Sequence, residues 1–225
     1  MDQGSPDPEL LAESLNDLAW YNHYLGATAT VAYQLERLLG GVVPSRLRIL
    51  DVGAGGGDML AALASWSEDR EVELEGVALE LGRETIRLAS QRIEGGGCSG
   101  RIRLVRGDAR SLPFAERAFD VAICSTFLHH LETEDAVVVL REMSRVSERG
   151  VVVSDLRRGR SGYLASLSLA LTVWGRHRYT RHDAPASMRA AFTLREARGL
   201  AERAGLDATV EPQPLYRWVL RWKRP

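Results

Sequence analysis

The chain has 225 residues, of which 45% are hydrophobic and 26% are charged. This length and composition are ordinary for one globular domain with a sizeable core, and the formal net charge of −1 argues against a protein built to hold nucleic acid. No run is long enough to span a membrane, and the first residues do not resemble a signal peptide. The two cysteines, Cys98 and Cys124, fit no pairing motif, so we expect a cytoplasmic protein.

The first 44 residues are predicted to form a helical cap. Apolar residues recur at helical spacing from Leu10 to Ala19 and again through Leu39, with an aromatic cluster between the two predicted helices. The first predicted strand begins only at Leu47, so the cluster has no place in a sheet. We therefore expect its aromatic side chains to contact a substrate: Trp20, Tyr21 and Tyr24.

A glycine-rich turn follows the first predicted strand. The apolar run Leu47–Leu50 leads into Asp51–Asp58, with glycines at 53, 55, 56 and 57, and then into a segment that favours a helix, 59–64. Glycines let the backbone bend and approach a ligand, and a helix N-terminus offers free N–H donors. The spacing departs from the dinucleotide pattern G-x-G-x-x-G, whose last position would fall on Asp58. The turn predicts a nucleotide-type site, with a ligand-free tight turn as the alternative.

Two acidic residues follow the next two predicted strands. Glu80 ends the strand Val72–Glu80, about two dozen residues beyond the glycine turn, where a carboxylate accepts both ribose hydroxyls in doubly wound folds. Asp108 lies in the turn after the strand Ile102–Val105. The alternatives are a solvated glutamate and an aspartate of an ordinary turn.

Two adjacent histidines leave the fourth predicted strand. Asp120 opens this strand, and His129 and His130 follow its end, where open α/β sheets bind ligands. A helix over Asp135–Val146 and a strand over Gly150–Ser154 come next. Because histidine is the natural base near neutral pH, either residue is a candidate base, although a capping or packing role is an equal alternative.

The interval of about 157–192 is predicted to be a lid between the fifth strand and a helix beginning near Thr193. Its first half is an apolar helix, Tyr163–Trp174, too short to cross a bilayer, and its second half is basic. His182 is a third candidate base. Arg157 and Arg181 would stabilise an anionic ligand such as a phenolate, enolate or carboxylate. The alternative is that these arginines belong to a solvated surface.

Four segments occur in an order typical of one family. They are D-x-G-x-G-x-G at 51–57, the acid at 80, G-D-A-x-x-L-P-F at 107–114 and L-H-H-L at 128–131. Over residues 45–156 the chain resembles the class I S-adenosylmethionine-dependent methyltransferases, although it lacks that family's proline and second glycine after Arg149. The resemblance implies an α/β, Rossmann-like fold with a seven-stranded sheet. We expect a cap over 1–44 and a methyltransferase domain over 45–225 that ends in an antiparallel hairpin, Asp207–Val210 with Tyr216–Trp222.

The resemblance also implies the cofactor, S-adenosyl-L-methionine. Asp51 would face its ammonium group, Glu80 would accept from the ribose hydroxyls, and Asp108 would accept from the adenine amine. No metal is implied. The expected cofactor-binding residues are Asp51, Gly53, Ala54, Gly55, Glu80, Leu81, Asp108, Ala109 and Ser125.

The expected acceptor is a hydrophobic small molecule. The chain is most similar to small bacterial enzymes that act on quinones, phenols and polyketides, and the apolar lid with nearby arginines favours such an acceptor. We expect methyl transfer to a phenolic or enolic oxygen in secondary metabolism. Transfer to a ring carbon and use of the cofactor without methyl transfer stay open as alternatives, as does a transient contact of the lid with a membrane surface. The sequence does not predict the oligomeric state.

Overall fold

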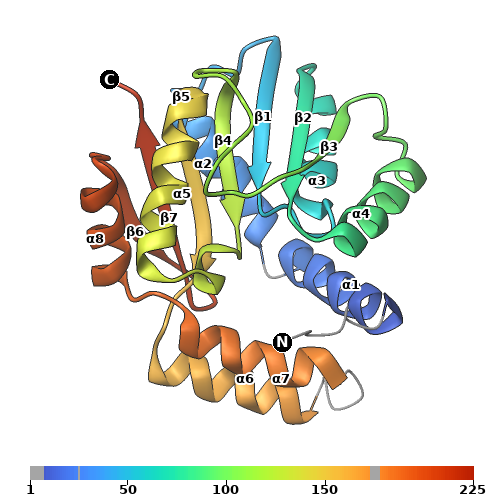
Figure 1. Ribbon diagram of the computed structural model, residues 1–225, viewed down its shortest axis with the longest axis vertical. Helices are drawn as coiled ribbons and strands as arrows, with labels where there is room; N and C mark the ends of the chain where they lie inside the picture. Colours follow the sequence, from blue (N-terminus) through green and yellow to red (C-terminus); the bar gives the residue numbers. More distant parts are fainter. Residues whose placement is uncertain (1–7, 25, 173–177) are drawn as a thin grey trace.

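The computed structural model of the protein describes residues 8–24, 26–172 and 178–225 (Figure 1). Its centre is one seven-stranded sheet in the order β3-β2-β1-β4-β5-β7-β6. Strands β1 to β5 are parallel, and β7 runs antiparallel to both β5 and β6. The strands are β1 (Arg46–Val52), β2 (Glu73–Glu80), β3 (Ile102–Arg106), β4 (Phe119–Ser125), β5 (Ser147–Leu156), β6 (Thr209–Gln213) and β7 (Arg217–Lys223).

Helices cover both faces of this sheet. Successive residues of a strand point to opposite faces, so Leu47 and Ile49 of β1 pack with α2 and α3, whereas Leu50 and Val52 pack with α5 and α8. The helices are α1 (Pro8–Tyr24), α2 (Ala27–Leu38), α3 (Asp58–Glu68), α4 (Arg83–Gly95), the short 3-10 helix η1 (Leu128–His130), α5 (Thr133–Val146), α6 (Arg160–Thr172), α7 (Arg178–Ala190) and α8 (Leu194–Ala204).

The fold class expected from the sequence is confirmed. Every predicted strand overlaps an observed one, and the C-terminal pair forms the predicted antiparallel hairpin at the sheet edge. Strand β5 starts directly after α5, in the place where the sequence lacks the family's proline and second glycine. The departure in sequence thus falls at the junction of α5 and β5.

The two N-terminal helices occupy different places. Helix α2 buries Val31, Leu35 and Leu38 completely or almost completely in the core, and it contacts β5 and β7. Only α1 lies beyond the edge at which β4 and β5 end, together with α6 and α7 (Figure 1). Of the two helices in the predicted cap, α2 is thus part of the sheet's covering layer, because its apolar stripe faces the strands.

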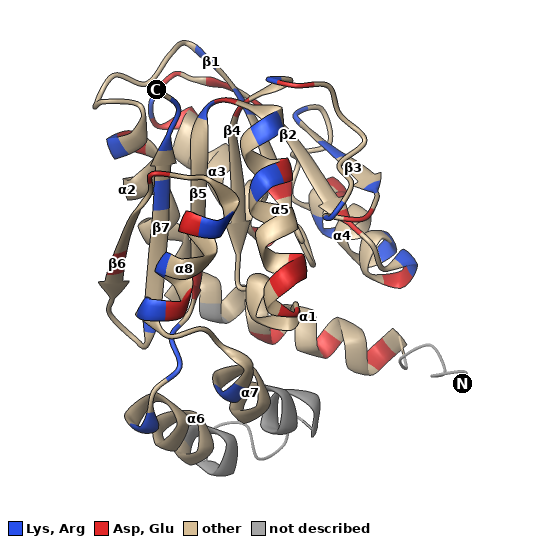
Figure 2. Cartoon of the chain, turned by 60° about the vertical axis from the view of Figure 1, so that its left-hand side comes forward, with Lys and Arg blue, Asp and Glu red and all other residues tan. Residues whose placement is uncertain are grey.

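Helices α6 and α7 lie side by side in both views of the chain (Figures 1 and 2). They fill the interval in which the sequence predicts a lid. Figure 2 also shows basic and acidic residues interspersed over α5 and α8, with no continuous basic area on that face. Among the described residues, no helix is both long and apolar enough to cross a membrane.

Replacing Thr193 by alanine is expected to lower the free energy of unfolding by about 1 kcal/mol. Thr193 and Glu196 form a reciprocal capping box at the start of α8, in which Glu196 accepts from the Thr193 N–H at 2.7 Å. Urea denaturation measures the effect. Thr133→Ala, at the exposed first residue of α5, is the matched control, because the α5 cap has no side-chain hydrogen bond. Equal stability of both variants would contradict the prediction.

Candidate active site

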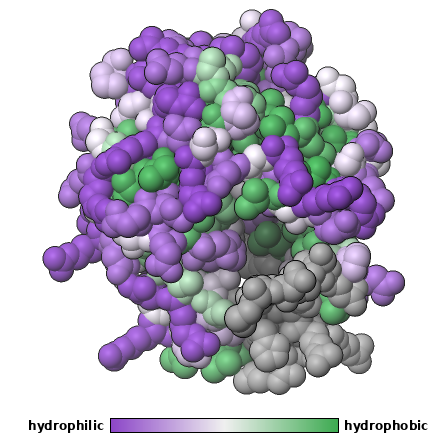
Figure 3. All heavy atoms as spheres, in the orientation of Figure 1, coloured by the Kyte–Doolittle hydropathy of each residue, from purple (hydrophilic) through white to green (hydrophobic). Residues whose placement is uncertain are grey.

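A cavity of ≈ 260 Å³ opens at the edge where the parallel strands end. It brings together segments that are far apart in the sequence: the turns after β1, β2 and β3 and the loop after β4. Figure 3 shows a hollow on the face seen in Figure 1, with hydrophobic residues at its floor. The described residues lining the cavity are Gly53, Leu79, Glu80, Leu81, Gly107, Asp108, Ala109, Arg110, Phe127, Leu131 and Asp135.

The glycine turn wraps closely around the end of β2. The N–H groups of Gly53 and Ala54 both donate to the carbonyl of Leu79 at 3.0 Å. Gly53 has a φ of +71°, and a Cβ at this position would lie 2.4 Å from the Phe127 ring. Only glycine therefore permits this backbone and lets the aromatic ring rest on the turn.

The Glu80 carboxylate is fixed by backbone donors from both sides of the cavity. Its Oε2 accepts from the Gly55 N–H at 3.1 Å, and its Oε1 accepts from the N–H groups of Leu81 and Gly82 at 2.9 Å. A carboxylate has about four acceptor sites, and these three donors fill three of them, both of Oε1 and one of Oε2. Oε2 can therefore accept one more hydrogen bond, as from a ribose hydroxyl.

Asp51 is a buried acid, and one of its carboxylate oxygens has no hydrogen-bond partner within the part of the chain that the structure describes. Its side chain is only 1% exposed, and the oxygen in question is Oδ2. Burial raises the pKa of Asp51 well above its ordinary value, and the nearby carboxylates Asp58 and Glu80 raise it further. A positive group brought to this place would relieve both effects, so the residues fit a cationic ligand such as the amino end of S-adenosylmethionine.

Asp108 is held by an arginine that the sequence reasoning passed over. Arg110 donates to Asp108 from its Nη2 at 2.7 Å and from its backbone at 2.9 Å, and its Nη1 reaches Asp135 at 3.2 Å. These hydrogen bonds lower the pKa of Asp108. The Asp108 carboxylate is therefore ionised and held in a fixed orientation at the cavity wall. The only sequence signal for the role of Arg110 was its position two residues after Asp108.

A histidine–aspartate pair lies on the adjoining strand ends. His129 Nδ1 is 2.7 Å from Asp155 Oδ1, the His129 N–H donates to Asp155 Oδ2 at 3.1 Å, and both side chains are 1% exposed. Burial acts to raise the pKa of Asp155, but the charge and hydrogen bond of His129 outweigh it and the pKa is lowered. The ionised carboxylate thus directs Nδ1–H toward itself and leaves Nε2 as the ring's acceptor nitrogen.

Comparisons with known proteins agree with this geometry. The model of a methyltransferase-domain family matches residues 49–150. The demethylmenaquinone methyltransferase of Roseiflexus castenholzii is 33% identical over 133 residues, which cover 59% of this chain and 49% of the relative. A solved S-adenosylmethionine-dependent methyltransferase from Aquifex aeolicus superposes with a TM-score of 0.64 at 14% identity, covering 97% and 99% of the two chains.

Residues 49–150 thus resemble a methyltransferase domain, and the chain has the fold of the S-adenosylmethionine-dependent methyltransferases. A further solved structure, the O-methyltransferase NcsB1 from neocarzinostatin biosynthesis with S-adenosylhomocysteine and 1,4-dihydroxy-2-naphthoic acid, superposes with a TM-score of 0.65 at 23% identity, covering 96% of this chain and 58% of that one. At these identities the solved structures establish the fold alone. The chain spans about half or less of the length of the curated relatives it matches, between 36% and 49%.

Five predicted cofactor residues of this methyltransferase domain line the cavity: Gly53, Glu80, Leu81, Asp108 and Ala109. Asp51, Ala54 and Gly55 lie in or beside the same glycine turn, behind the lining. Ser125 ends β4, with its hydroxyl 3.4 Å from that of Thr126. Sequence reasoning missed Phe127, Leu131 and Asp135, which reach the cavity only through the path of the chain after β4.

The other predicted catalytic residues stand apart from the buried pair. His130 is partly exposed, and its ring centroid lies 4.1 Å from that of His129. Partial burial lowers the pKa of His130, and the neighbouring His129 lowers it further. A lowered pKa keeps the His130 ring neutral. The side chain of His182, on α7, lies outside the described residues.

The predicted substrate residues are only partly described. Trp20 and Tyr24 are 53% and 65% exposed on α1, with ring centroids 4.9 Å apart. The buried member of this aromatic segment is Asn22, at 4% exposure. Arg157 donates its N–H to the Tyr216 carbonyl at 2.7 Å. The side chains of Tyr21 and Arg181 lie outside the described residues, so the roles of all these residues in substrate binding stay predictions.

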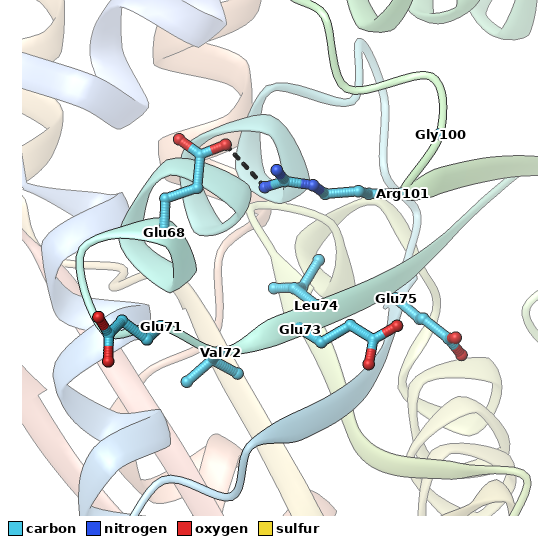
Figure 4. Close-up of a pocket in the computed structure, with 8 residues that line it drawn as sticks. All are labelled: Glu68, Glu71, Val72, Glu73, Leu74, Glu75, Gly100 and Arg101. Atoms are coloured by element: carbon cyan, nitrogen blue, oxygen red, sulfur yellow. Dashed lines mark hydrogen bonds and ion pairs between the residues drawn. The ribbon is translucent and has the colours of Figure 1, made fainter.

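A second pocket of ≈ 480 Å³ lies at the other end of β2 (Figure 4). Acidic side chains dominate it, and one of them, Glu68, is paired with Arg101 at 2.7 Å. It contains no histidine or cysteine and lies away from the glycine turn. Among the described residues, no group of three or more His, Cys, Asp or Glu side chains is arranged to hold a metal ion. The carboxyl edge is therefore the candidate site, although its cavity is the smaller one.

Proposed function

We propose that the protein transfers a methyl group from S-adenosylmethionine to a phenolic or enolic oxygen of a hydrophobic aromatic small molecule. The observation that carries this proposal is the place of the His129–Asp155 pair at the same sheet edge as the cofactor cavity. One short loop connects them, since Phe127 lines the cavity and His129 follows two residues later. A binding site and a candidate base thus adjoin.

The cofactor, when bound, supplies a methyl group on a positively charged sulfur. On the protein's side, Asp51 would balance the positive amino end, Glu80 would accept from the ribose and Asp108 from the adenine amine. The glycine turn would let the backbone approach closely. These residues hold and orient the donor, and transfer then depends on bringing the acceptor to near-attack distance in a dry site.

The base we assign is His129. Its Nδ1–H donates to Asp155, so Nε2 can take the proton of an acceptor hydroxyl as the oxygen gains its methyl group. Asp155 would hold the ring in this tautomer and stabilise the imidazolium that forms, as in other histidine–carboxylate pairs. Within the described residues, this is the only candidate base with a buried carboxylate at its second nitrogen.

Two observations support an aromatic acceptor. A relative is named for demethylmenaquinone, and a structural neighbour holds 1,4-dihydroxy-2-naphthoic acid. The neighbour is named an O-methyltransferase, whereas another relative, from Idiomarina loihiensis, is named a ubiquinone/menaquinone biosynthesis C-methyltransferase, so transfer to a ring carbon is the second candidate. A role in secondary metabolism and a contact with a membrane surface stay proposals, the latter testable by liposome co-sedimentation.

The test is transfer of labelled methyl groups to a panel of acceptors. The panel contains 1,4-dihydroxy-2-naphthoic acid, a naphthol without the carboxyl group and a long-chain fatty acid. We expect label in the aromatic hydroxyl compounds and not in the fatty acid, and mass spectrometry of the product distinguishes oxygen from carbon methylation. Cofactor binding without transfer to any aromatic compound would refute the proposal and favour a binding protein.

Cofactor binding is expected to release a proton from Asp51. Because its pKa is raised well above the ordinary value, the carboxyl group keeps its proton in the free protein at pH values where other aspartates are ionised. A positive ligand favours the carboxylate, so S-adenosylhomocysteine should bind more tightly as pH rises toward that raised pKa and level off above it. Calorimetry in two buffers of different ionisation enthalpy measures the released proton.

Asp51→Asn should abolish this proton release. Asp69→Asn, at the end of α3, is the matched control and should leave it unchanged. The same binding enthalpy in both buffers for the wild-type protein would mean that Asp51 is already ionised, and the prediction would be wrong.

A further inference from the structure

A buried amide joins α1 to two parts of the candidate site. Asn22 is 4% exposed. Its Nδ2 donates to Asp58 Oδ2 at 2.9 Å, and its Oδ1 accepts from Arg217 Nη2 at 3.3 Å. The orientation of the amide follows from charge, because its NH₂ must face the carboxylate and its carbonyl must face the guanidinium. The amide supplies both the donor and the acceptor without a charge of its own.

Asp58 places one end of this bridge in the cofactor turn. It is the first residue of α3, directly after Gly57, and its charge is one of the two that raise the pKa of Asp51. A hydrogen bond from α1 to Asp58 therefore acts on the part of the turn that, in the proposed function, would face the amino end of the cofactor.

Arg217 carries the other end of the bridge to the loop after β4. It is 7% exposed and donates to Thr126 Oγ1 from Nη2 at 2.7 Å and from Nη1 at 3.2 Å. Thr126 has a φ of +54°, a conformation that a β-branched residue rarely adopts and that its surroundings must hold. The next residue, Phe127, rests on Gly53, and His129 follows. The Arg217 guanidinium thus holds the conformation of the loop that carries Phe127 and His129.

Within the described residues, the side-chain hydrogen bonds of Arg217 go to the neutral oxygens of Thr126 and Asn22, although the guanidinium is buried. Burial lowers its pKa, and Asp155 acts against this, but the Asp155 carboxylate is already hydrogen-bonded to His129. Burying a guanidinium is costly unless all its partners are well placed. The contact with Asn22 is therefore one that the loop conformation depends on.

We propose that Asn22 is a positioning residue of the methyl-transfer site, which couples the docking of α1 to the cofactor turn through Asp58 and to the catalytic loop through Arg217 and Thr126. This rests on the proposed function. Coupling between two binding events is reciprocal. If the docked α1 stabilises the cofactor turn, a bound cofactor stabilises the docked α1.

Hydrogen–deuterium exchange with and without S-adenosylhomocysteine tests the coupling. In the wild-type protein, S-adenosylhomocysteine should slow the exchange of backbone amide hydrogens in α1, residues 8–24. Asn22→Leu keeps the size of the side chain but removes both contacts. We expect it to abolish this protection and to weaken S-adenosylhomocysteine binding about ten- to hundredfold in calorimetry, the range for hydrogen bonds to charged groups.

Glu13→Leu is the control, since it places the same side chain on the same helix. Glu13 is exposed, so this variant should keep both the protection and an affinity within about twofold of the wild type. Wild-type behaviour of Asn22→Leu, or an equal effect of Glu13→Leu, would overturn the proposal.

Thr126→Val is the second variant, for the case that Asn22→Leu does not fold. It retains the shape of the side chain but removes the hydroxyl that accepts from Arg217. We expect it to reduce the ligand-induced protection of α1 against exchange, although Thr126 lies in the loop after β4. Unchanged protection would overturn the proposal. A wild-type protein that binds no S-adenosylhomocysteine would overturn the proposed function as well, whereas wild-type binding with unaffected variants would overturn this inference alone.

Discussion

A His129→Gln variant is expected to lose turnover by about a hundredfold to ten-thousandfold, the range for removal of a general base. The amide of glutamine can still donate to Asp155, so the buried carboxylate keeps a partner and the fold is preserved. The glutamine amide cannot take up a proton at neutral pH. The substitution therefore removes the base and keeps the hydrogen bond to Asp155. Initial rates with the best acceptor of the panel, together with calorimetry of S-adenosylhomocysteine, measure the effect, and we expect cofactor affinity to change little.

His130→Gln is the matched control because it makes the same change in the adjacent ring. This ring is exposed and is hydrogen-bonded to no carboxylate among the described contacts, so the variant should retain most of its turnover. Asp155→Asn should behave like His129→Gln, since an asparagine would no longer fix the tautomer. Near wild-type turnover in both His129→Gln and Asp155→Asn would rule out His129 as the base. His182 would then be the remaining candidate base.

Replacing Glu80 by alanine is expected to weaken binding of S-adenosylhomocysteine by at least about 1.5–3 kcal/mol, the value of a hydrogen bond to a charged group. The substitution removes the expected acceptor of the ribose hydroxyls. It also releases the N–H groups of Gly55, Leu81 and Gly82, which now converge on the carboxylate. Isothermal titration calorimetry gives the change in dissociation constant, roughly tenfold or more.

Glu75→Ala provides the comparison on the same strand. Glu75 lies on β2 but pairs with Arg46 at the protein surface, so its loss should leave cofactor binding within about twofold of the wild type. If Glu80→Ala binds S-adenosylhomocysteine as tightly as Glu75→Ala does, the carboxylate does not contact the ribose. Tighter binding of a nicotinamide dinucleotide than of S-adenosylhomocysteine would contradict the assigned cofactor itself.

The cofactor side of the site could be predicted from local sequence. Each of its signals lies at a strand end or in the turn that follows: the glycines after β1, Glu80 after β2 and Asp108 after β3. Parallel strands bring their carboxyl ends to one edge, so residues at these ends meet once the strands are recognised. Short apolar runs such as Leu47–Leu50 predicted those strands, and Gly53, Glu80 and Asp108 line one cavity in the structure.

The acceptor side depended on contacts that no local pattern encodes. His129 and Asp155 are 26 residues apart and meet because β4 and β5 are neighbours in the sheet. Asn22 and Arg217 are 195 residues apart, and they meet because β7 is inserted beside β5 while α1 lies across the same edge. Helical periodicity likewise predicted two N-terminal helices but not that only α1 reaches the site.

The sequence by itself determined the fold class, the cofactor turn and the acids around it, because short-range periodicity and turn chemistry specify strands, helices and their ends. Only the tertiary structure decided that His129 is tied to Asp155 and that the buried residue of the aromatic segment is Asn22. Strand order and helix docking bring such groups together, and their hydrogen bonds are strengthened because several elements jointly exclude water from them. A sequence pattern within one segment does not predict such contacts between distant residues.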